Sequence, residues 1–281
     1  LSNPLYRYNG EELSLAYPQA TDVAVRIYDH AGKINLREIS RGRLRTLIEK
    51  KLGEDSDLEH IDQLMEAWND WLDLNDGASD IGAEQEYYQG LDVPYDTRNG
   101  ALETVGELLE VRGFADVFGD VNLDAAFTIY GEDELVNLNL ATIEAMQLLP
   151  GLDDELIAEI VEWRKENEFQ GNGDVAQIVP TESMTELRAW LNSRKTTNYY
   201  TIMVYPREGA GGVENSAEDN EENDETATKD NEAAEEDRRT AFAETVYVPA
   251  ATERPQVLKI NPYETLPLAA VPTAVDDEEA Q

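Results

Sequence analysis

The amino-acid sequence predicts an α+β protein in which an antiparallel β-sheet carries a large helical insertion. Two observations support this fold class. Apolar and polar residues alternate, as in half-buried strands, at 21–29, 199–205 and 241–248. Between the first and second of these segments, apolar residues recur at helical spacing over long stretches. The resulting order of strand, helices, strands, helices and strands is typical of α+β folds.

Shorter extended segments complete the predicted sheet. A turn at Gly32 follows the first strand, and residues before 20 are polar and irregular, with Pro4 and Pro18. Further extended pieces are expected at 34–36, 128–130, 136–138 and 257–260.

The helices are predicted from apolar periodicity and from capping residues. Asp57 is placed to cap a helix whose broad apolar face consists of Ile61, Leu64, Met65, Trp68, Trp71 and Leu72. A second helix is expected over 101–111, closed by Gly113. Ser183 and Glu186 have capping-box spacing. Later helices are expected at about 141–149, 153–166 and 183–193.

Two segments lack the large apolar residues that a folded structure requires. The segment 209–240 is rich in Glu, Asp, Asn and Ala, so burial cannot offset the entropy cost of ordering it. We predict that it is a disordered acidic insertion in a β-hairpin formed by 199–205 and 241–248. A second disordered region is predicted for the tail, 263–281.

Composition limits the classes of function. The 281 residues include 60 acidic and 22 basic side chains, which gives a formal net charge of −38. This charge favours solubility, cations and basic partners, and it repels phosphate backbones and anionic membranes. The absence of cysteine excludes disulfides, thiol catalysis and thiolate metal sites. With His30 and His60 as its two histidines, the chain is not expected to hold a multi-histidine zinc or iron site.

The sequence contains no recognisable catalytic motif. It has no G-x-S-x-G nucleophile turn, no G-x-G-x-x-G segment and no P-loop. His30 beside a turn and His60 on a helix are expected to be exposed or half-buried. No run of residues resembles a signal peptide or a membrane-spanning helix. Because the chain begins at Leu1 without Met, we expect a processed or truncated product.

An acidic loop follows the predicted helix that contains Trp71. It offers the oxygen-bearing side chains Asp73, Asn75, Asp76, Asp80, Glu84 and Glu86. Calcium takes roughly six to eight oxygen ligands, which such a loop supplies. The EF-hand spacing is not matched, because Gly77 is misplaced and no Glu closes the loop. A solvated acidic loop and a pair of glycosidase-type carboxylates are alternative interpretations.

A second loop, 149–154, resembles a helix-hairpin-helix turn between two predicted helices. Such hairpins bring backbone N–H groups at a helix N-terminus close to phosphate. Here that terminus carries Asp153, Asp154 and Glu155, and Asp153 stands where the second hairpin glycine is usual. The negative charge opposes phosphate, so packing is the favoured interpretation.

Five segments, taken in order, resemble one known family. They are Asp29–Leu36, Trp68–Asp73, Gly82–Tyr88, Glu107–Gly113 and Val136–Ala141. Together they resemble the K-type minor pseudopilin of the type II secretion system over about residues 20 to 205. In this family, a hydrophobic N-terminal helix anchors the protein in the bacterial inner membrane, a pilin-like antiparallel sheet follows, and a large helical domain is inserted in the sheet.

The resemblance implies a division of this chain. The pilin-like domain would comprise 1–36 and 126–262, with sheet strands from 20–36, 126–140 and 198–260, and the helical domain would be 37–125. The anchor helix is missing from this sequence, so the chain is expected to be a soluble ectodomain that faces the periplasm. Its membrane association would occur only through that missing helix.

The resemblance also implies a function and a metal site. The family caps the pseudopilus tip with the I and J subunits and binds calcium in its helical domain. Carried over to this chain, the calcium loop would extend from Trp71 to Glu86, hold one or two ions and use Asp73, Asn75, Asp76 and Glu84 as ligands. We therefore expect a non-catalytic tip subunit that initiates and caps the filament for protein export. A helix-hairpin-helix nucleic-acid-binding protein and a secreted carboxylate-based hydrolase are the rival interpretations.

Overall fold

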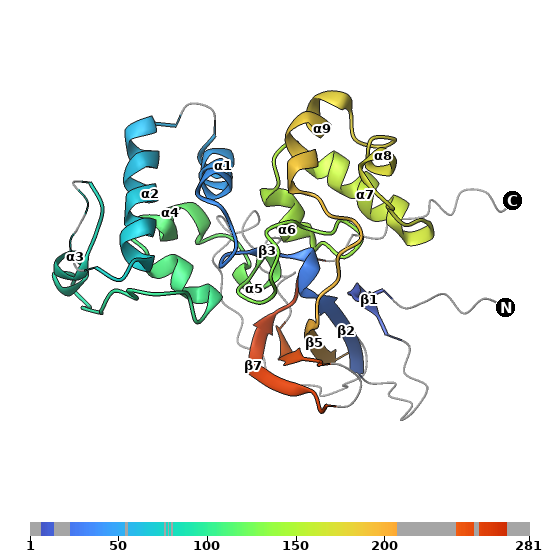
Figure 1. Ribbon diagram of the computed structural model, residues 1–281. Coiled ribbons are helices and arrows are strands. Elements are labelled where there is room, and N and C mark those ends of the chain that lie inside the picture. Colours follow the sequence, from blue (N-terminus) through green and yellow to red (C-terminus); the bar gives the residue numbers. More distant parts are fainter. Residues whose placement is uncertain are drawn as a thin grey trace, which may run out of the picture. The chain divides into compact units, whose positions relative to one another are not determined.

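The computed structural model (Figure 1) divides the chain into two compact units. It describes residues 7–13, 23–53, 56–75, 77, 79, 81–206, 240–249 and 253–268. As far as they are described, Leu1–Asp29 and Asn198–Leu266 form the sheet unit, and His30–Thr197 and Pro267–Gln281 form the helical unit. The chain leaves the sheet unit after Asp29, builds most of the helical unit and then returns.

Within the described residues, the sheet unit contains five antiparallel strands in the order β1-β2-β5-β6-β7. Their bounds are Asn9–Glu12 for β1, Val23–Asp29 for β2, Tyr199–Pro206 for β5, Thr240–Tyr247 for β6 and Gln256–Thr265 for β7. In the pairing of β2 with β5, Asp29 lies opposite Tyr200. The two ends of the inserted segment therefore join adjacent strands. These observations confirm the predicted α+β class.

The predicted strands at 21–29, 199–205 and 241–248 correspond to β2, β5 and β6. Side chains two positions apart on a strand point to the same face, so their alternation buries one face of the sheet. The buried cluster of this unit consists of Ala24, Tyr28, Met203, Tyr205, Ala241 and Ala243.

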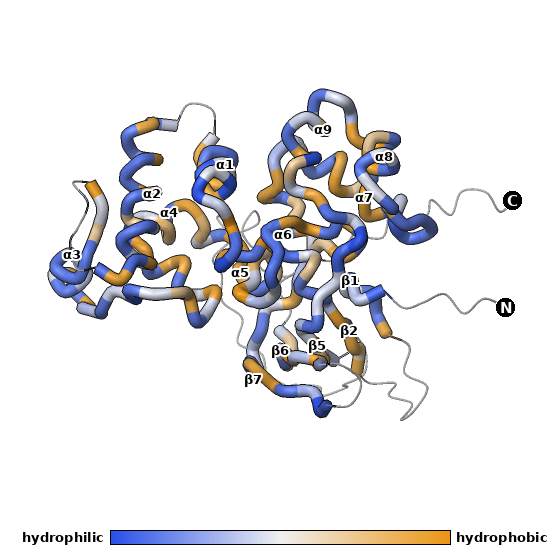
Figure 2. The backbone as a smooth tube through the Cα atoms, viewed as in Figure 1, coloured by the Kyte–Doolittle hydropathy of each residue, from blue (hydrophilic) through white to orange (hydrophobic). Residues whose placement is uncertain are grey.

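The helical unit has a larger core, built by short helices whose apolar and polar stretches alternate (Figure 2). Its α-helices are α1 (Arg41–Leu52), α2 (Leu58–Leu72), α3 (Gln85–Gln89), α4 (Phe114–Phe118), α5 (Leu123–Ala126), α6 (Ile143–Leu148), α7 (Asp154–Glu166), α8 (Asn172–Val175) and α9 (Thr181–Leu187). Its 3-10 turns lie at His30–Gly32, Val105–Glu110 and Arg188–Trp190. None of the described helices is long and apolar enough to cross a membrane.

Helix α2 forms as its sequence predicts. The Asp57 side chain accepts a hydrogen bond from the Glu59 backbone N–H at 3.0 Å and caps the helix. Five of the six residues on the predicted apolar face are buried, and Leu72 is half-buried. In addition, Trp68 stacks on Phe114 of α4.

The segment from Tyr28 to Leu36 is buried without interruption. Its two-residue strand β3 (Ile34–Asn35) pairs in parallel with β4 (Phe127–Thr128), apart from the five-stranded sheet. His30 lies 2.7 Å from the Thr128 hydroxyl, and Lys33 Nζ donates to the Asp124 carbonyl at 2.6 Å. These partners satisfy polar groups that would otherwise be costly to bury. The expectation that His30 is exposed or half-buried was therefore wrong.

Two buried amides in the 136–141 segment join distant parts of the helical unit. Asn137 Nδ2 donates to the Lys195 carbonyl at 2.7 Å. Asn139 Nδ2 donates to the carbonyls of Phe169 and Ser193, and its Oδ1 accepts from the Phe169 N–H at 2.8 Å. The family-like pattern at 136–141 is thus a packing motif of this unit.

These contacts change the predicted domain boundaries. The extended pieces at 34–36 and 128–130 correspond to β3 and β4, and they pair with each other rather than joining the main sheet. Near 136–138, Val136 forms only an isolated bridge to Leu191. Residues 30–36 and 126–197 accordingly pack in the helical unit, whereas the predicted insertion covered 37–125.

Several element ends also differ from prediction. The segment 101–111 forms a 3-10 turn at Val105–Glu110 instead of a longer helix. Gly113, with φ of 79°, precedes α4 and does not close the earlier helix. Ser183 does not cap a helix, because α9 begins earlier, at Thr181 after Pro180.

The sheet extends further at both edges than the sequence predicts. The region before residue 20 was expected to be irregular, but β1 pairs with β2, and Asn9 lies opposite Tyr28. At the other edge, β7 continues to Thr265 and passes the predicted domain end at 262. The predicted disorder of 209–240 and 263–281 was wrong at Thr240, which begins β6, and at 263–265, which belong to β7. The remainder of 209–240 and residues 269–281 lie outside those the structure describes.

Candidate metal centre and hairpin

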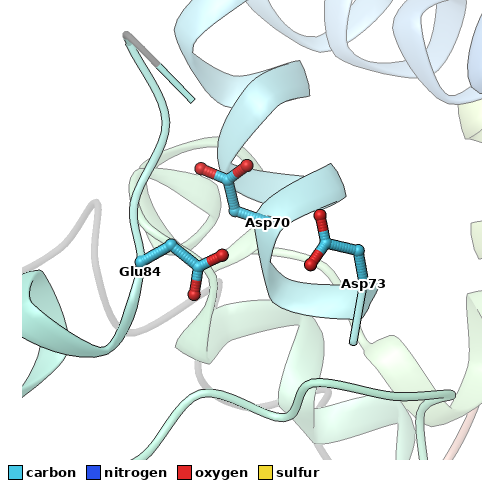
Figure 3. A group of neighbouring side chains, drawn as sticks. All are labelled: Asp70, Asp73 and Glu84. Carbon is cyan, nitrogen blue, oxygen red and sulfur yellow. The ribbon is translucent and has the colours of Figure 1, made fainter. Parts of the chain in front are cut away.

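Three carboxylates of the helical unit converge at the C-terminal end of α2 (Figure 3). Asp70, Asp73 and Glu84 each offer one oxygen, and these three oxygens lie within 4.8 Å of one another. Asp70 and Glu84 are buried, and Asp73 is half-buried. Among the described residues, this is the only such group of acidic, histidine or cysteine side chains.

Helix α2 positions the first two carboxylates. Asp70 and Asp73 are three residues apart, so they share one side of the last helical turn. Asp73 is also the C-cap residue, and its backbone N–H donates to the Asn69 carbonyl. Asp70 Oδ2 accepts from the backbone N–H of Ser79 at 3.2 Å and from its hydroxyl at 3.1 Å. The loop after α2 is thereby held against the helix.

Glu84 enters the group from the start of α3. Its backbone carbonyl accepts from the Tyr87 N–H, while its side chain makes no capping hydrogen bond. Just before it, Gly82 passes so close to Asp70 that a Cβ on Gly82 would overlap Asp70 Oδ2. Arg112 Nη1 donates to the Gly82 carbonyl at 3.0 Å. Gly82 and Arg112 thus keep the segment that leads into α3 close to the carboxylate of Asp70.

Aromatic side chains pack together next to the chain segments that carry the three carboxylates. Trp71 and Tyr88 are fully buried, and their ring centroids lie 5.1 Å apart in an edge-to-face arrangement. Tyr95 packs against both rings. The Tyr88 hydroxyl accepts from the Arg112 N–H, and burial raises the pKa of Tyr88 to about 12. Trp71, which follows Asp70, and Tyr88, four residues after Glu84, are therefore anchored in the core.

The donor set suits a hard cation. Three carboxylates in a partly buried site repel one another unless a cation or protons neutralise them. Only oxygen atoms converge in the group, as calcium or magnesium prefers, with no sulfur or imidazole ligand among them. The fixed backbone at Gly82 shows that the group is closely packed and is not a loose acidic surface.

The predicted ligands fall in different places. The group includes Asp73 and Glu84. Asn75 lies beside it: its Nδ2 donates to Asp73 Oδ2 at 2.8 Å, and its Oδ1 accepts from the Gly77 N–H at 2.8 Å. Asp76 is outside the described residues. Asp70 was not among the predicted ligands, because these were all taken from the loop. Its position three residues before Asp73, on the same side of a helix, was the signal that could have identified it.

The second loop of interest joins α6 to α7. Thr142 caps α6 by accepting from the Ala145 N–H, and Asp153 caps α7 by accepting from the Leu156 N–H at 2.8 Å. The carboxylate of Asp153 therefore occupies one of the N-terminal N–H groups that would face a phosphate, and it places negative charge there. Gly151 has φ of 74°, and a Cβ there would overlap the Ser183 carbonyl, so α9 lies directly against the turn.

The carbonyls of this hairpin turn face a lysine from α1. Lys50 Nζ donates to the Leu149 carbonyl at 2.5 Å and to the Leu152 carbonyl at 2.8 Å. Burial lowers the pKa of Lys50 to about 8, although nearby Asp153, with other acids, acts in the opposite direction. The hairpin is thus packed against α1, as the sequence analysis favoured.

One further buried acid of the helical unit, Glu144, lies apart from both loops. Glu144, in the first turn of α6, accepts through Oε1 from the Leu268 N–H at 2.7 Å. Burial raises its pKa to about 7, while the positive charge of Lys33 acts in the opposite direction. Glu144 is 5% exposed and covered by chain, so it does not stand in an open cleft as a hydrolase acid would.

A family model and a curated relative that are similar to this chain both describe the same protein of the type II secretion system. The family model for the type II secretion system (T2SS), protein K, matches residues 32–118. A curated relative, type II secretion system protein K of Pectobacterium carotovorum subsp. carotovorum, is 37% identical over 67 residues, which are 24% of this chain and 20% of that protein. This match spans only about a fifth of the relative's length.

The fold has a solved counterpart. A chain in the crystal structure of the GspK-GspI-GspJ complex from the enterotoxigenic Escherichia coli Type 2 Secretion System aligns with a TM-score of 0.51. The alignment covers 85% of this chain and 79% of that chain at 14% identity, which is evidence for a common fold. The sequence over residues 32–118 is therefore similar to protein K of the type II secretion system, and the fold over most of the length is similar to a chain of the GspK-GspI-GspJ complex.

Proposed function

We propose that the chain is a minor pseudopilin that assembles with I-like and J-like pseudopilins at the tip of the type II secretion pseudopilus. One observation carries the proposal: the sequence match lies in the helical unit, whereas the fold likeness extends over both units. The structure that provides this likeness is a complex that contains GspI and GspJ. This chain would initiate and cap the filament by assembly, without catalysis.

The architecture supports a capping role. The helical unit is inserted between neighbouring strands β2 and β5, so the pilin-like sheet carries a second, larger folded body. This second body adds bulk that the next pseudopilin would have to accommodate. We infer a location in the periplasm at the pseudopilus tip, with inner-membrane attachment through the hydrophobic N-terminal helix that the family resemblance implies.

Co-assembly provides the direct test. The chain is mixed with the soluble domains of I-like and J-like pseudopilins of its own secretion system, and light scattering behind size exclusion measures the mass. We expect one complex that contains all three chains, whereas a major pseudopilin domain used as control should elute separately. Separate elution of all three chains at micromolar concentration would contradict the proposal.

We further propose that Asp70, Asp73 and Glu84 bind calcium, with Asn75 and Asp76 of the same loop as the other predicted ligands. The close approach of three carboxylate oxygens, which lie within 4.8 Å of one another, supports this assignment. Calcium would supply positive charge there and join the end of α2 to the start of α3. One or two ions are compatible with the number of acids in the loop.

Thermal unfolding tests the calcium proposal. A ligand that binds only the folded state raises the melting temperature by mass action. We expect a higher melting temperature in calcium than in chelator at matched ionic strength, and Asp73→Ala with Glu84→Ala should remove most of that increase. Asp92→Ala is the matched control, because Asp92 is an exposed acid outside the group. Equal melting temperatures with and without calcium would disprove the site.

The nucleic-acid rival receives no support from the hairpin. Its helix N-terminus is capped by Asp153, and its turn is packed against α1 and α9. We infer that the hairpin serves intramolecular packing, and that titration with duplex DNA at moderate salt will show no binding.

A further inference from the structure

The hairpin between α6 and α7 exposes two backbone oxygens to one cation of the same chain. Leu149 ends α6, and Leu152 lies just before the cap of α7. Carbonyls at a helix C-terminus lack intrahelical partners and carry partial negative charge. Here both oxygens lie within hydrogen-bonding distance of the same atom, Lys50 Nζ, at 2.5 Å and 2.8 Å.

Lys50 reaches this position from the last turn of α1. Leu47 and Ile48 of that turn are fully buried, so the helix cannot rotate to withdraw the side chain without disrupting the core. The neighbouring Lys51 differs, because it forms an ion pair with Asp120, whose side chain is 72% exposed. The two adjacent lysines thus have different roles. Lys51 pairs with an exposed carboxylate, and Lys50 donates hydrogen bonds to two backbone carbonyls.

Three acidic side chains near Lys50 oppose the effect of burial on its charge. A cavity of about 600 Å³ beside the hairpin is lined by Lys50, Thr46, Glu49, Pro150, Gly151 and Glu186, among others. The charged groups that act on Lys50 are Asp153 and Asp154 of the α7 start and Glu186 of α9, and all three favour its positive form. Glu49, which also lines the cavity, pairs with Arg45 instead.

We propose that the 149–152 turn is a cation site, occupied by the Lys50 ammonium, that fixes the hairpin to α1. Helix α1 is tied in turn to α2, the helix that carries Asp70, through the ion pairs Arg41–Glu66 and Arg45–Asp62. Lys50 is therefore a positioning residue that connects the hairpin, through α1, to the helix that carries Asp70. When its side chain is removed, the turn takes a primary alkylammonium ion in its place.

Chemical rescue tests this assignment. Propylammonium restores the atoms that Lys50→Ala removes beyond Cβ. Lys50→Ala should lower the melting temperature by several degrees and speed amide exchange around Leu152 by roughly tenfold, the scale of one or two lost hydrogen bonds. Propylammonium chloride should reverse most of both changes. Tetramethylammonium chloride, which cannot donate a hydrogen bond, should reverse neither.

Control variants keep the result interpretable. Lys51→Ala should change amide exchange at the hairpin little and should not respond to propylammonium. If Lys50→Ala fails to fold, the variants Lys50→Met and Lys50→Arg decide: amide exchange around Leu152 should be roughly tenfold faster in Lys50→Met than in Lys50→Arg, which keeps a cation that donates hydrogen bonds. Equal exchange in these two variants, unchanged exchange in Lys50→Ala, or equal rescue by tetramethylammonium would overturn the proposal.

Discussion

The loop after α2 and the loop after α6 meet the same physical requirement in opposite ways. Each gathers oxygen atoms in a partly buried place where negative charge must be balanced. The first loop gathers the carboxylates of Asp70, Asp73 and Glu84. The second gathers two carbonyls and receives its cation, Lys50, from within the chain. The second loop thus receives its cation when the chain folds, whereas the first loop can take a cation from solution.

The difference follows from the kind of oxygen. Carbonyls have partial charges, and one ammonium satisfies two of them by hydrogen bonds. Three carboxylates carry full charges, and a single monovalent side chain cannot neutralise them. In an acidic chain with only 22 basic residues, a divalent ion from solution is the simpler means of balance.

A large effect is predicted when charge is removed at the first loop. Asp70→Asn with Glu84→Gln keeps side-chain size but leaves one carboxylate in the group. Calcium at a hundredfold its dissociation constant should stabilise the wild type by about 2.7 kcal/mol and this variant by far less. In chelator, the variant should be at least as stable as the wild type, because repulsion is reduced. Urea unfolding with and without calcium measures both quantities.

The next prediction concerns a buried acid that takes a proton instead of a cation. Because burial raises the pKa of Glu144 to about 7 from 4.5, the folded state holds a proton that the unfolded state releases earlier. The contribution of Glu144 is fully present below pH 4.5 and is lost as pH rises through 7. Glu144→Gln should remove this loss, which is on the order of 3 kcal/mol at pH 8. The difference in unfolding free energy between variant and wild type, followed from pH 4 to 8, measures it; a constant difference would contradict the assignment.

A smaller effect is expected for coupling between the loops. If the two loops balance charge independently, a Lys50→Met variant should keep the calcium-induced increase in unfolding free energy to within about 0.5 kcal/mol. A much smaller increase in the variant would show that α1 transmits the hairpin contact to the metal group. The triple variant Lys50→Met, Asp73→Ala, Glu84→Ala completes the cycle.

A small effect is also expected for charge outside both loops. Strands β5 and β6 pair with Val204 opposite Phe242, so Pro206 and Thr240 are placed to be joined by a two-residue turn. Replacing 207–239 by Asn-Gly removes many acids and should change the free energy of unfolding by about 1 kcal/mol or less, since loop length enters only logarithmically. The calcium response should be unchanged. Loss of folding would show that the segment does more than connect the two strands.

The sequence predicts those features that depend on local pattern. Alternation located β2, β5 and β6, and helical spacing with the Asp57 cap located α2. It did not predict β1, because that strand is short and depends on pairing with Tyr28 and its neighbours. It also placed β3 and β4 in the wrong sheet, since two extended residues contain no information about their partner.

The candidate site was predicted in part for similar reasons. Asp73 and Glu84 could be identified because acids concentrate in that loop, and both lie in the group. Asp70 was missed because a charged residue on an amphipathic helix resembles one of its solvated positions. The role of Lys50 could not be inferred, because its partners Leu149 and Leu152 bind through backbone oxygens, which every residue has.

The adjacency of Asp29 and Tyr200 has a consequence for the order of folding. These residues pair across β2 and β5, although nearly all of the helical unit lies between them in the chain. Closing so long an unfolded loop costs entropy and slows folding, but a helical unit that is already folded brings its two ends together. We therefore expect the helical unit to form first and the β2–β5 pairing to follow as the late step. Mutations at the Asp29 end of β2 should then mainly accelerate unfolding and leave the early folding phase unchanged.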